Sequence, residues 1–334
     1  MGLFRRKSEA GAPVEETIRA FPTPVPEPRA DGLRDFAAQR DYLLDILDPL
    51  APFGVDLLDA VGLTLNESIT AEHGLPVSGI KVGDILVREG VRIQPRLIGL
   101  FAALGVDKVI TRPRPRIVVI PVVRPGETPS TGHDLASFLV AAELQAQGSQ
   151  VWHVPAQAQD EADLARLIND QMIRADLIVT TGGFAPDEIS VTQVLGEVGV
   201  VDATPVAITP GRQQAFALVG DDAVPLLALP SDPLAAHVLL ATLVIPVARK
   251  LIGADAVLPP VERGRVTQPV SVTPGLLTCA HVIVGDSGTL SFRARRQGAD
   301  ALVAINRANG IVLLESDGGH IDIGSWVDYI PLVR

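Results

Sequence analysis

The sequence is poor in cysteine, in aromatic side chains and in long apolar runs. Its single cysteine, Cys279, excludes an internal disulfide and suits a reducing cytoplasm, where we expect the protein to act. Aromatic residues make up only 4% of the chain, so the stacking platforms that bind nucleic-acid bases are scarce. No uninterrupted apolar stretch reaches the roughly 20 residues of a transmembrane helix, so no membrane span is expected.

Positive charge is also in short supply. Lys and Arg number 28 against 39 Asp and Glu, and the formal net charge of −11 argues against a nucleic-acid partner. What the chain does have is apolar residues, 47% of 334. That is enough to form the cores of about two or three domains.

Residues 1–35 combine charges and small residues with five prolines. This composition favours extended, unpacked backbone, so we expect a disordered Pro-rich tail that is dispensable for folding. The basic tip of Arg5, Arg6 and Lys7 falls short of the clusters that bind acidic membranes.

A short apolar run ends in two glycines near the middle of the chain. Leu177 to Thr181 reads as a buried parallel strand, and Gly182 and Gly183 let the backbone turn tightly after it. Because open α/β sheets bind ligands at the carboxyl ends of their strands, these glycines mark a candidate pocket mouth. The alternative is a plain strand-to-helix connection.

Strand and helix patterns alternate around this run. Residues 117–120, 151–154 and 226–229 read as further strands, with amphipathic helices between them and a long helix that begins at Asp232-Pro233. Pro246 is expected to kink that helix or to begin a new segment.

The two flanks have different patterns. Residues 33 to about 60 look helical, and 79–93 read as a strand pair. Beyond Pro259 and Pro260, short alternating runs separated by glycine-rich turns predict a small all-β domain: 265–272, 277–284, 290–295, 301–305, 311–314 and 326–333.

Several short motifs occur in one order within residues 38–334: Asp176-Leu-Ile-Val-Thr-Thr-Gly-Gly183, Thr209-Pro-Gly211, Leu229-Pro230 with Pro233, and Asn306-Arg-Ala-Asn-Gly310. In this order they resemble the MoeA molybdopterin molybdenumtransferases and the gephyrin E domain. The resemblance implies an α/β fold with a molybdopterin-binding (MoeA/MogA-like) three-layer domain at 112–254. It also implies an N-terminal helical linker and dimerisation region at 36–111 and a C-terminal small β domain at 255–334.

The resemblance also implies a ligand site, with molybdopterin and Mg²⁺ as its ligand and ion. Carried over position by position, the candidates for ligand binding are Thr181, Gly182, Gly183, Asp187, Pro210, Gly211, Arg212, Ser231 and Asp232.

The positions that would serve catalysis are substituted. Arg124 stands at an acidic position, while Gln159 and Ser190 each replace an aspartate. Glu188 is a further altered position; with Asp187 it forms either a remnant acidic pair or ordinary first-turn acids of a helix. The β domain that the family inserts after the motif at Gly74 to Gly79 is lost. Because Mg²⁺ prefers oxygen ligands, these changes indicate a degenerate, shortened member, and we assign no catalytic or metal-binding residue to it.

Two functions remain open on this basis. The first is a non-catalytic, homodimeric scaffold that recruits a peptide tail, by analogy a cell-division or membrane-receptor partner. Its groove would include Tyr329, Pro331 and Leu332 on the last strand, unless these residues simply close the core. The alternative is a molybdopterin molybdenumtransferase that inserts molybdate into (adenylyl-)molybdopterin.

Overall fold

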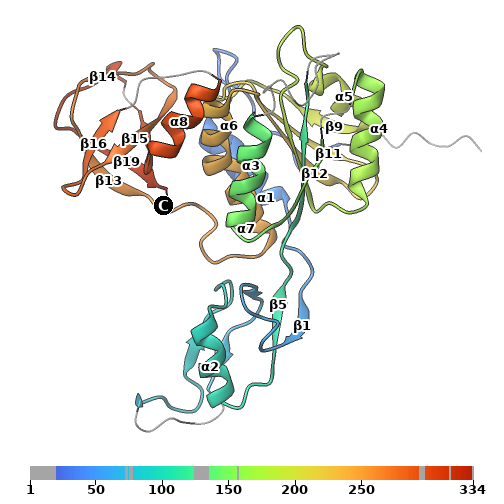
Figure 1. Ribbon diagram of the computed structural model, residues 1–334, viewed down its shortest axis with the longest axis vertical. Coiled ribbons are helices and arrows are strands. Elements are labelled where there is room, and N and C mark those ends of the chain that lie inside the picture. The colour runs from blue at the N-terminus through green and yellow to red at the C-terminus, as the bar shows by residue number, and fades with distance from the viewer. Residues whose placement is uncertain are drawn as a thin grey trace, which may run out of the picture.

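The protein has a central α/β body with a β barrel beside it and a smaller lobe below it (Figure 1). The computed structural model describes residues 20–71, 74, 78–123, 135–155, 158–292, 298–315 and 317–332. The α/β fold class with a small C-terminal β domain is confirmed.

The α/β body contains a six-stranded sheet in the order β7-β6-β8-β12-β11-β9. Four neighbouring strands are parallel: β7 (Gln150–His153), β6 (Arg116–Pro121), β8 (Leu177–Thr181) and β12 (Val224–Leu229). The sheet is extended by β11 (Ala215–Val219) and β9 (Gly199–Asp202), which are antiparallel and do not stand out in the sequence. The sheet's central strand, β8, is the apolar run that ends in Gly182 and Gly183, and all five of its residues are buried.

Helices cover both faces of this sheet, which makes three layers. One face packs against α1 (Phe36–Ile46), α3 (Leu135–Ala146) and the long helix Pro233–Leu251, and its core includes Ile117, Val119 and Leu177. The other face packs against α4 (Glu161–Met172) and α5 (Val191–Val198).

The α6–α7 rod is one long apolar helix, Pro233–Leu251. It runs through α6 (Pro233–Leu239), a π-helical turn η3 (Leu240–Val244) and α7 (Ile245–Leu251). Pro246 has no N–H to donate, and the wider turn just before it accommodates the missing hydrogen bond, so the expected interruption is confirmed. The rod could span a membrane by length and composition, but 83% of its most apolar window is buried inside the protein.

The C-terminal part forms a small barrel. Its strands are β13 (Glu262–Val266), β15 (Leu277–Val284), β16 (Thr289–Phe292), β17 (Gly310–Leu314) and β19 (Trp326–Pro331), with β10 (Ile208–Thr209) added at one edge. The pairing of β15 with β17 closes the ring. A two-stranded ribbon of β14 (Val270–Ser271) and β18 (His320–Ile321) lies outside it.

One expected strand of this domain is a helix. Residues 301–305 lie in α8 (Ala299–Arg307), where Ala301 and Ile305 are buried four residues apart and contact Leu234 of α6. The short window fits an alternating pattern and a helical one equally, and packing against α6 decides for the helix.

The lobe is built mostly from strands rather than helices. It contains β1 (Phe53–Asp56), β2 (Thr64–Leu65), β3 (Ile69–Thr70), β4 (Ile85–Val87), α2 (Pro95–Ala103) and β5 (Lys108–Arg112) around a small core with Phe101 and Val109. The expected helical region ends at Ile46, three residues before Pro49, because a proline disfavours helical backbone in the residue that precedes it. The partner of β4 is β3, so the segment 71–84 is all that joins them and leaves no room for an inserted domain.

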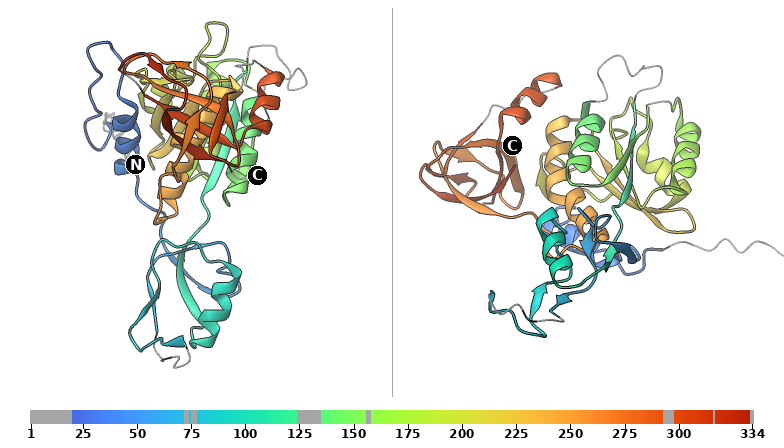
Figure 2. Two further views of the ribbon diagram at one scale, coloured as in Figure 1. Left: turned by 90° about the vertical axis from the view of Figure 1, so that its left-hand side faces the viewer. Right: turned by 60° about the horizontal axis from the view of Figure 1, so that its bottom comes forward.

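The N-terminal segment from Ala20 to Asp35 is ordered against the body, so the prediction of a disordered tail is wrong for these residues; residues 1–19 lie outside the described part. Phe21 stacks on Phe216 of β11 with ring centroids 5.5 Å apart. Tyr42 donates its hydroxyl to the carbonyl of Thr23 at 2.9 Å. Figure 2 shows this segment, in blue, lying along the body.

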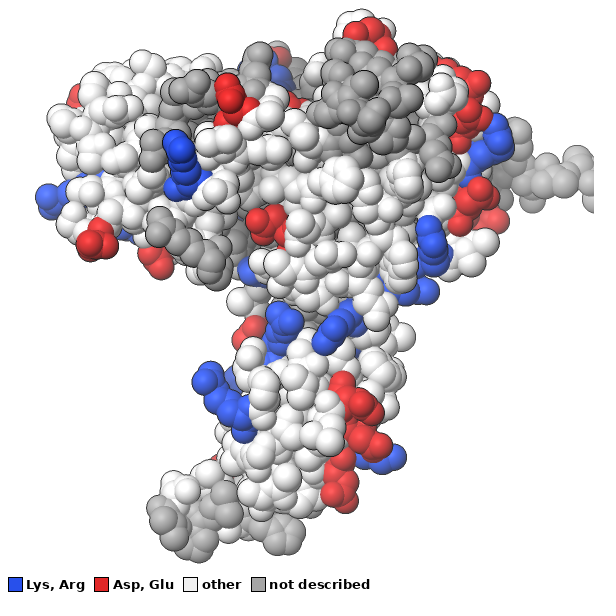
Figure 3. Space-filling view, viewed as in Figure 1, with Lys and Arg blue, Asp and Glu red and all other residues white. Residues whose placement is uncertain are grey.

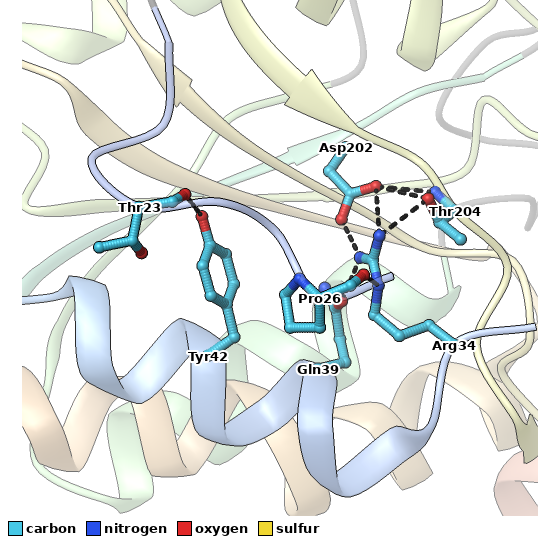
Figure 4. A network of polar contacts seen from close by, with 7 residues as sticks. All are labelled: Thr23, Pro26, Arg34, Gln39, Tyr42, Asp202 and Thr204. Atoms are coloured by element: carbon cyan, nitrogen blue, oxygen red, sulfur yellow. Dashed lines mark hydrogen bonds and ion pairs between the residues drawn. The ribbon is translucent and has the colours of Figure 1, made fainter. Parts of the chain in front are cut away.

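A buried arginine fastens the segment. Arg34 pairs with Asp202 of β9 and also donates to Gln39, to Thr204 at 3.0 Å and to the carbonyl of Pro26 at 2.7 Å (Figure 4). The side chains of Arg34 and Asp202 are 4% and 10% exposed, so water screens the pair weakly. Composition alone could not reveal this partner, which lies far along the chain.

We expect Arg34→Ala to lower the free energy of unfolding by roughly 3–5 kcal/mol, because it leaves Asp202 buried without its cation. Chemical denaturation measures this loss. Arg40→Ala, which breaks a more exposed pair with Asp41, is the control and should cost at most about 1 kcal/mol. Equal effects of the two substitutions would contradict the role given to Arg34.

Two buried histidines join the body to the barrel. His237 of α6 and His281 of β15 share a hydrogen bond of 2.7 Å between Nδ1 and Nε2, so one ring must donate and the other accept. Burial lowers the pKa of both imidazoles, and the neighbouring His237 lowers that of His281 further. The junction therefore favours the uncharged forms.

This pair predicts a loss of stability on acidification. The unfolded histidines bind protons as the pH falls below about 6.5, whereas the folded pair does not, so the free energy of unfolding decreases with falling pH. The double substitution His237→Leu with His281→Leu should flatten that dependence, measured by denaturation between pH 7 and 4.5. His320→Gln, at an exposed site, is the control; an unchanged slope in the double variant would refute the assignment.

Candidate functional site

The candidate site begins at the carboxyl end of strand β8, which lies inside the sheet. Gly182 and Gly183 have φ values of 97° and 86°, which L side chains rarely adopt. A Cβ added at Gly182 would lie 2.3 Å from the carbonyl oxygen of Val122, and one at Gly183 would lie 2.6 Å from the Cβ of Val191. Only glycine fits both positions, so the close approach of neighbouring segments shapes this turn.

The turn directs three backbone amides toward one point. The N–H groups of Gly183, Phe184 and Ala185 all donate to the Oε2 atom of Glu188, at 2.7, 3.0 and 3.2 Å. We call these three N–H groups the amide nest. Successive amides arranged in this way form a concave site for an anion, and here the chain's own carboxylate fills it.

The next strand end contributes to the same site. Ser231, which follows β12, donates its hydroxyl to the Oε1 atom of Glu188 at 3.3 Å. Asp232 beside it caps α6 by accepting the N–H of Ala235 at 3.3 Å, with Pro233 at the start of the helix as expected. Of the residues predicted from the sequence, Gly183 and Ser231 therefore contact Glu188, while Thr181 and Gly182 lead directly into the nest.

Other predicted positions have local roles. Ser190 caps α5 by accepting the N–H of Gln193, and Gln159 is exposed in the loop after β7. Asp187 is exposed beside Glu188. Because α5 begins at Val191, Asp187 and Glu188 precede the helix and the first-turn interpretation is wrong. Arg124 lies outside the described residues.

The loop Pro210 to Arg212 lies at the same end of the sheet, near the carboxyl end of β12, because Ala215 of β11 pairs with Ala228 of β12. Gly211 approaches Leu239, where a Cβ would meet the side chain at 2.8 Å, and its carbonyl accepts the side-chain amide of Gln214 at 3.1 Å. Arg212 is exposed. Within the described part of the chain, Glu188 makes its hydrogen bonds to the nest and to Ser231 and not to this loop, so the structure does not bring the loop into the amide nest.

The chemistry of this site is anion binding. Backbone amides oriented in this way bind the oxygens of either a phosphate or a carboxylate. Among the described residues, no three His, Cys, Asp or Glu side chains gather to hold a metal ion. The described part therefore fits the anionic tail of a ligand and does not itself form a magnesium site.

The structure places Tyr329, one of the three predicted groove residues, in the core of the barrel. Tyr329 is 6% exposed in the barrel core and donates its hydroxyl to Glu262, which raises the pKa of Tyr329 to about 12. Pro331 and Leu332 are half-buried. The neighbouring positions Trp326 and Ile330 instead line a groove of about 610 Å³ between the barrel and α1. Tyr329 therefore closes the core and cannot contact a docked peptide there.

The comparisons with known proteins agree with this geometry. The family model described as a probable molybdopterin binding domain matches residues 118–250, which include the amide nest. Molybdopterin molybdenumtransferase 1 of Mycobacterium tuberculosis is 30% identical over 76% of this chain and 63% of its own length. The Haemophilus influenzae molybdopterin molybdenumtransferase is 26% identical over 75% of this chain and 65% of its own length. The chain thus spans less than two thirds of these relatives.

Solved structures show the same fold at low identity. A molybdopterin biosynthesis MoeA protein from Pyrococcus horikoshii matches with a TM-score of 0.76 and 15% identity, covering 90% of this chain and all of its own. A molybdenum cofactor biosynthesis protein from Pyrococcus furiosus matches with a TM-score of 0.71, 20% identity and coverage of 90% and 99%. These comparisons relate the chain to the MoeA-type molybdopterin molybdenumtransferases: it shares their fold, and its residues 118–250 match the molybdopterin-binding domain.

Proposed function

We propose that the chain binds molybdopterin, or its adenylylated form, and serves the molybdenum-transfer reaction after which its relatives are named. The observation that carries the proposal is the amide nest of Gly183, Phe184 and Ala185 at the sheet edge, inside the region matched by the molybdopterin-binding model. A phosphate group on the ligand would accept the three N–H groups that Glu188 now accepts.

Ligand binding would require Glu188 to leave the nest. A carboxylate and a phosphate cannot share three donors, because their like charges repel at contact distance. Glu188 would therefore swing away and release the hydroxyl of Ser231 to the ligand. The side chain acts as an internal competitor. The apparent affinity for the ligand equals the affinity of the open nest multiplied by the fraction of time that the nest is open.

The relatives support this function over the scaffold. Their names describe molybdenumtransferases and molybdopterin biosynthesis proteins rather than scaffolds. The scaffold keeps one favourable observation, the groove beside Trp326 and Ile330, where Trp326 is 49% exposed. From the sequence we further expect that the protein acts in the cytoplasm and forms a homodimer.

We expect Glu188→Ala to bind adenylylated molybdopterin more tightly, by about tenfold, because the nest no longer has to release a charged acceptor worth roughly 1.5–3 kcal/mol. Isothermal titration calorimetry measures the change. Glu188→Gln keeps the shape of the side chain with a weaker, neutral acceptor and should fall between the wild type and the alanine variant.

Glu197→Ala is the matched control, since it removes an exposed carboxylate of α5, whereas the three nest amides donate to Glu188. Its affinity should stay within about twofold of the wild type, as expected for an exposed charge. Loss of binding in Glu188→Ala, with the fold intact by circular dichroism, would show that the carboxylate holds the ligand rather than competing with it.

Complementation separates the transferase from the scaffold. We expect the chain to restore molybdoenzyme activity in a strain that lacks its own molybdopterin molybdenumtransferase. Ligand binding without restored activity would assign the chain to a non-catalytic role in the same family. Failure of both would refute the proposed function.

A further inference from the structure

Four arginines surround a cavity of about 180 Å³ at the neck between the lobe and the α/β body. Arg92 belongs to the lobe, Arg112 and Arg114 to the segment that enters the body, and Arg249 to the end of α7. Figure 3 shows Lys and Arg side chains gathered at this neck. We call this cavity the neck pocket.

The arginines bind no carboxylate in the described part of the chain. Arg92 donates to the carbonyl of Gly62 at 3.2 Å and Arg249 to that of Leu258 at 3.2 Å. The other two likewise donate to carbonyls: Arg112 to Leu50, and Arg114 to Val61 at 3.4 Å. A guanidinium has five N–H donors, so most of the donors of these arginines have no protein partner among the described residues.

Only one acidic side chain, Asp255, lines the neck pocket as described. Burial lowers the pKa of Arg249, and no carboxylate pairs with this arginine among the described residues. Four like charges beside one carboxylate repel one another, in a chain whose net charge is −11. An anion in the cavity would remove that repulsion.

Glycines make the room for the guanidinium groups. A Cβ at Gly148 would lie 2.7 Å from Nη2 of Arg92, and one at Gly253 would lie 2.6 Å from Nε of Arg112. A Cβ at Gly62 would lie 3.1 Å from Nη2 of Arg114. All three glycines have positive φ, at 96°, 61° and 81°. Side chains at these positions would push the arginines out of the pocket.

We propose that the neck pocket binds a multiply charged oxyanion, either free or as a phosphate group of a small molecule. The planar fork of arginine matches phosphate oxygens and binds them in pairs, which an ammonium group cannot do. The site is separate from the amide nest. Pro115 and Ser149 come just before β6 and β7, so the pocket lies at the amino ends of these parallel strands. The carboxyl end of β8, with the amide nest, is at the other end of the sheet.

A bound oxyanion would tie the lobe to the body. Arg92 reaches the pocket from the lobe and Arg249 from α7, while the connection between the two parts is narrow in Figure 1. An anion that contacts both arginines would restrict movement of the lobe about the neck. Binding should therefore raise the melting temperature and slow amide exchange in residues 62–64 and at Arg112 and Arg114.

The test is titration calorimetry of the wild type at constant ionic strength with inorganic phosphate, pyrophosphate, molybdate and ATP without magnesium. The variant Arg92→Gln with Arg249→Gln should weaken binding by about tenfold or more, since it removes two charge-assisted partners. Arg166→Gln, at an exposed arginine of α4 paired with Asp163, is the matched control and should leave the affinity unchanged.

A second variant, which should strengthen binding, keeps the test informative if the double variant does not fold. Asp255→Asn removes the carboxylate from the lining and should tighten binding by several-fold. Binding of phosphate or molybdate alone would identify a free oxyanion, and binding of ATP alone a phosphate on a larger molecule; both support the proposal. No binding of any probe, or binding that neither the double variant nor Asp255→Asn alters, would overturn it.

Discussion

The narrow space between β8 and the segment after β6 governs the candidate site. At Gly182 a Cβ would lie 2.3 Å from the carbonyl oxygen of Val122, and the amides of Val122 and Gly182 donate to the carbonyls of Thr181 and Leu229. This contact holds three strand ends together and forces the chain into the left-handed turn that follows. The turn in turn directs the amides of Gly183, Phe184 and Ala185 toward Glu188. The geometry of the amide nest thus follows from how tightly the carboxyl ends of these strands pack.

Much of the central domain could be predicted from the sequence because its signals are local. Buried parallel strands read as apolar runs, so Leu177 to Thr181 is recognisable with its closing glycines. The candidate residues Gly182, Gly183 and Ser231 follow strand ends, where topology places ligand sites. Glu188 stands out in the sequence only as an altered position, because its role depends on the shape of a turn that residue type alone does not specify.

The remaining errors come from contacts between distant residues. Arg34 finds Asp202 far along the chain, and this pair orders a proline-rich segment whose composition favours disorder. Tyr329 and Ile330 are neighbours on one strand, yet the first faces the core and the second the groove, since a shift of one residue reverses the face. The alternating pattern at Ala301 to Ile305 predicts a strand, but the segment is helical because Ala301 and Ile305 pack together against Leu234 of α6.

The central claim is that the amide nest is the ligand site and that Glu188 occupies it until the ligand arrives. A crystal structure of the chain with adenylylated molybdopterin tests this most directly. The account predicts a phosphate oxygen within hydrogen-bond distance of the N–H groups of Gly183, Phe184 and Ala185, with the Glu188 side chain turned away from them. A ligand bound elsewhere, with Glu188 still accepting all three amides, would contradict it.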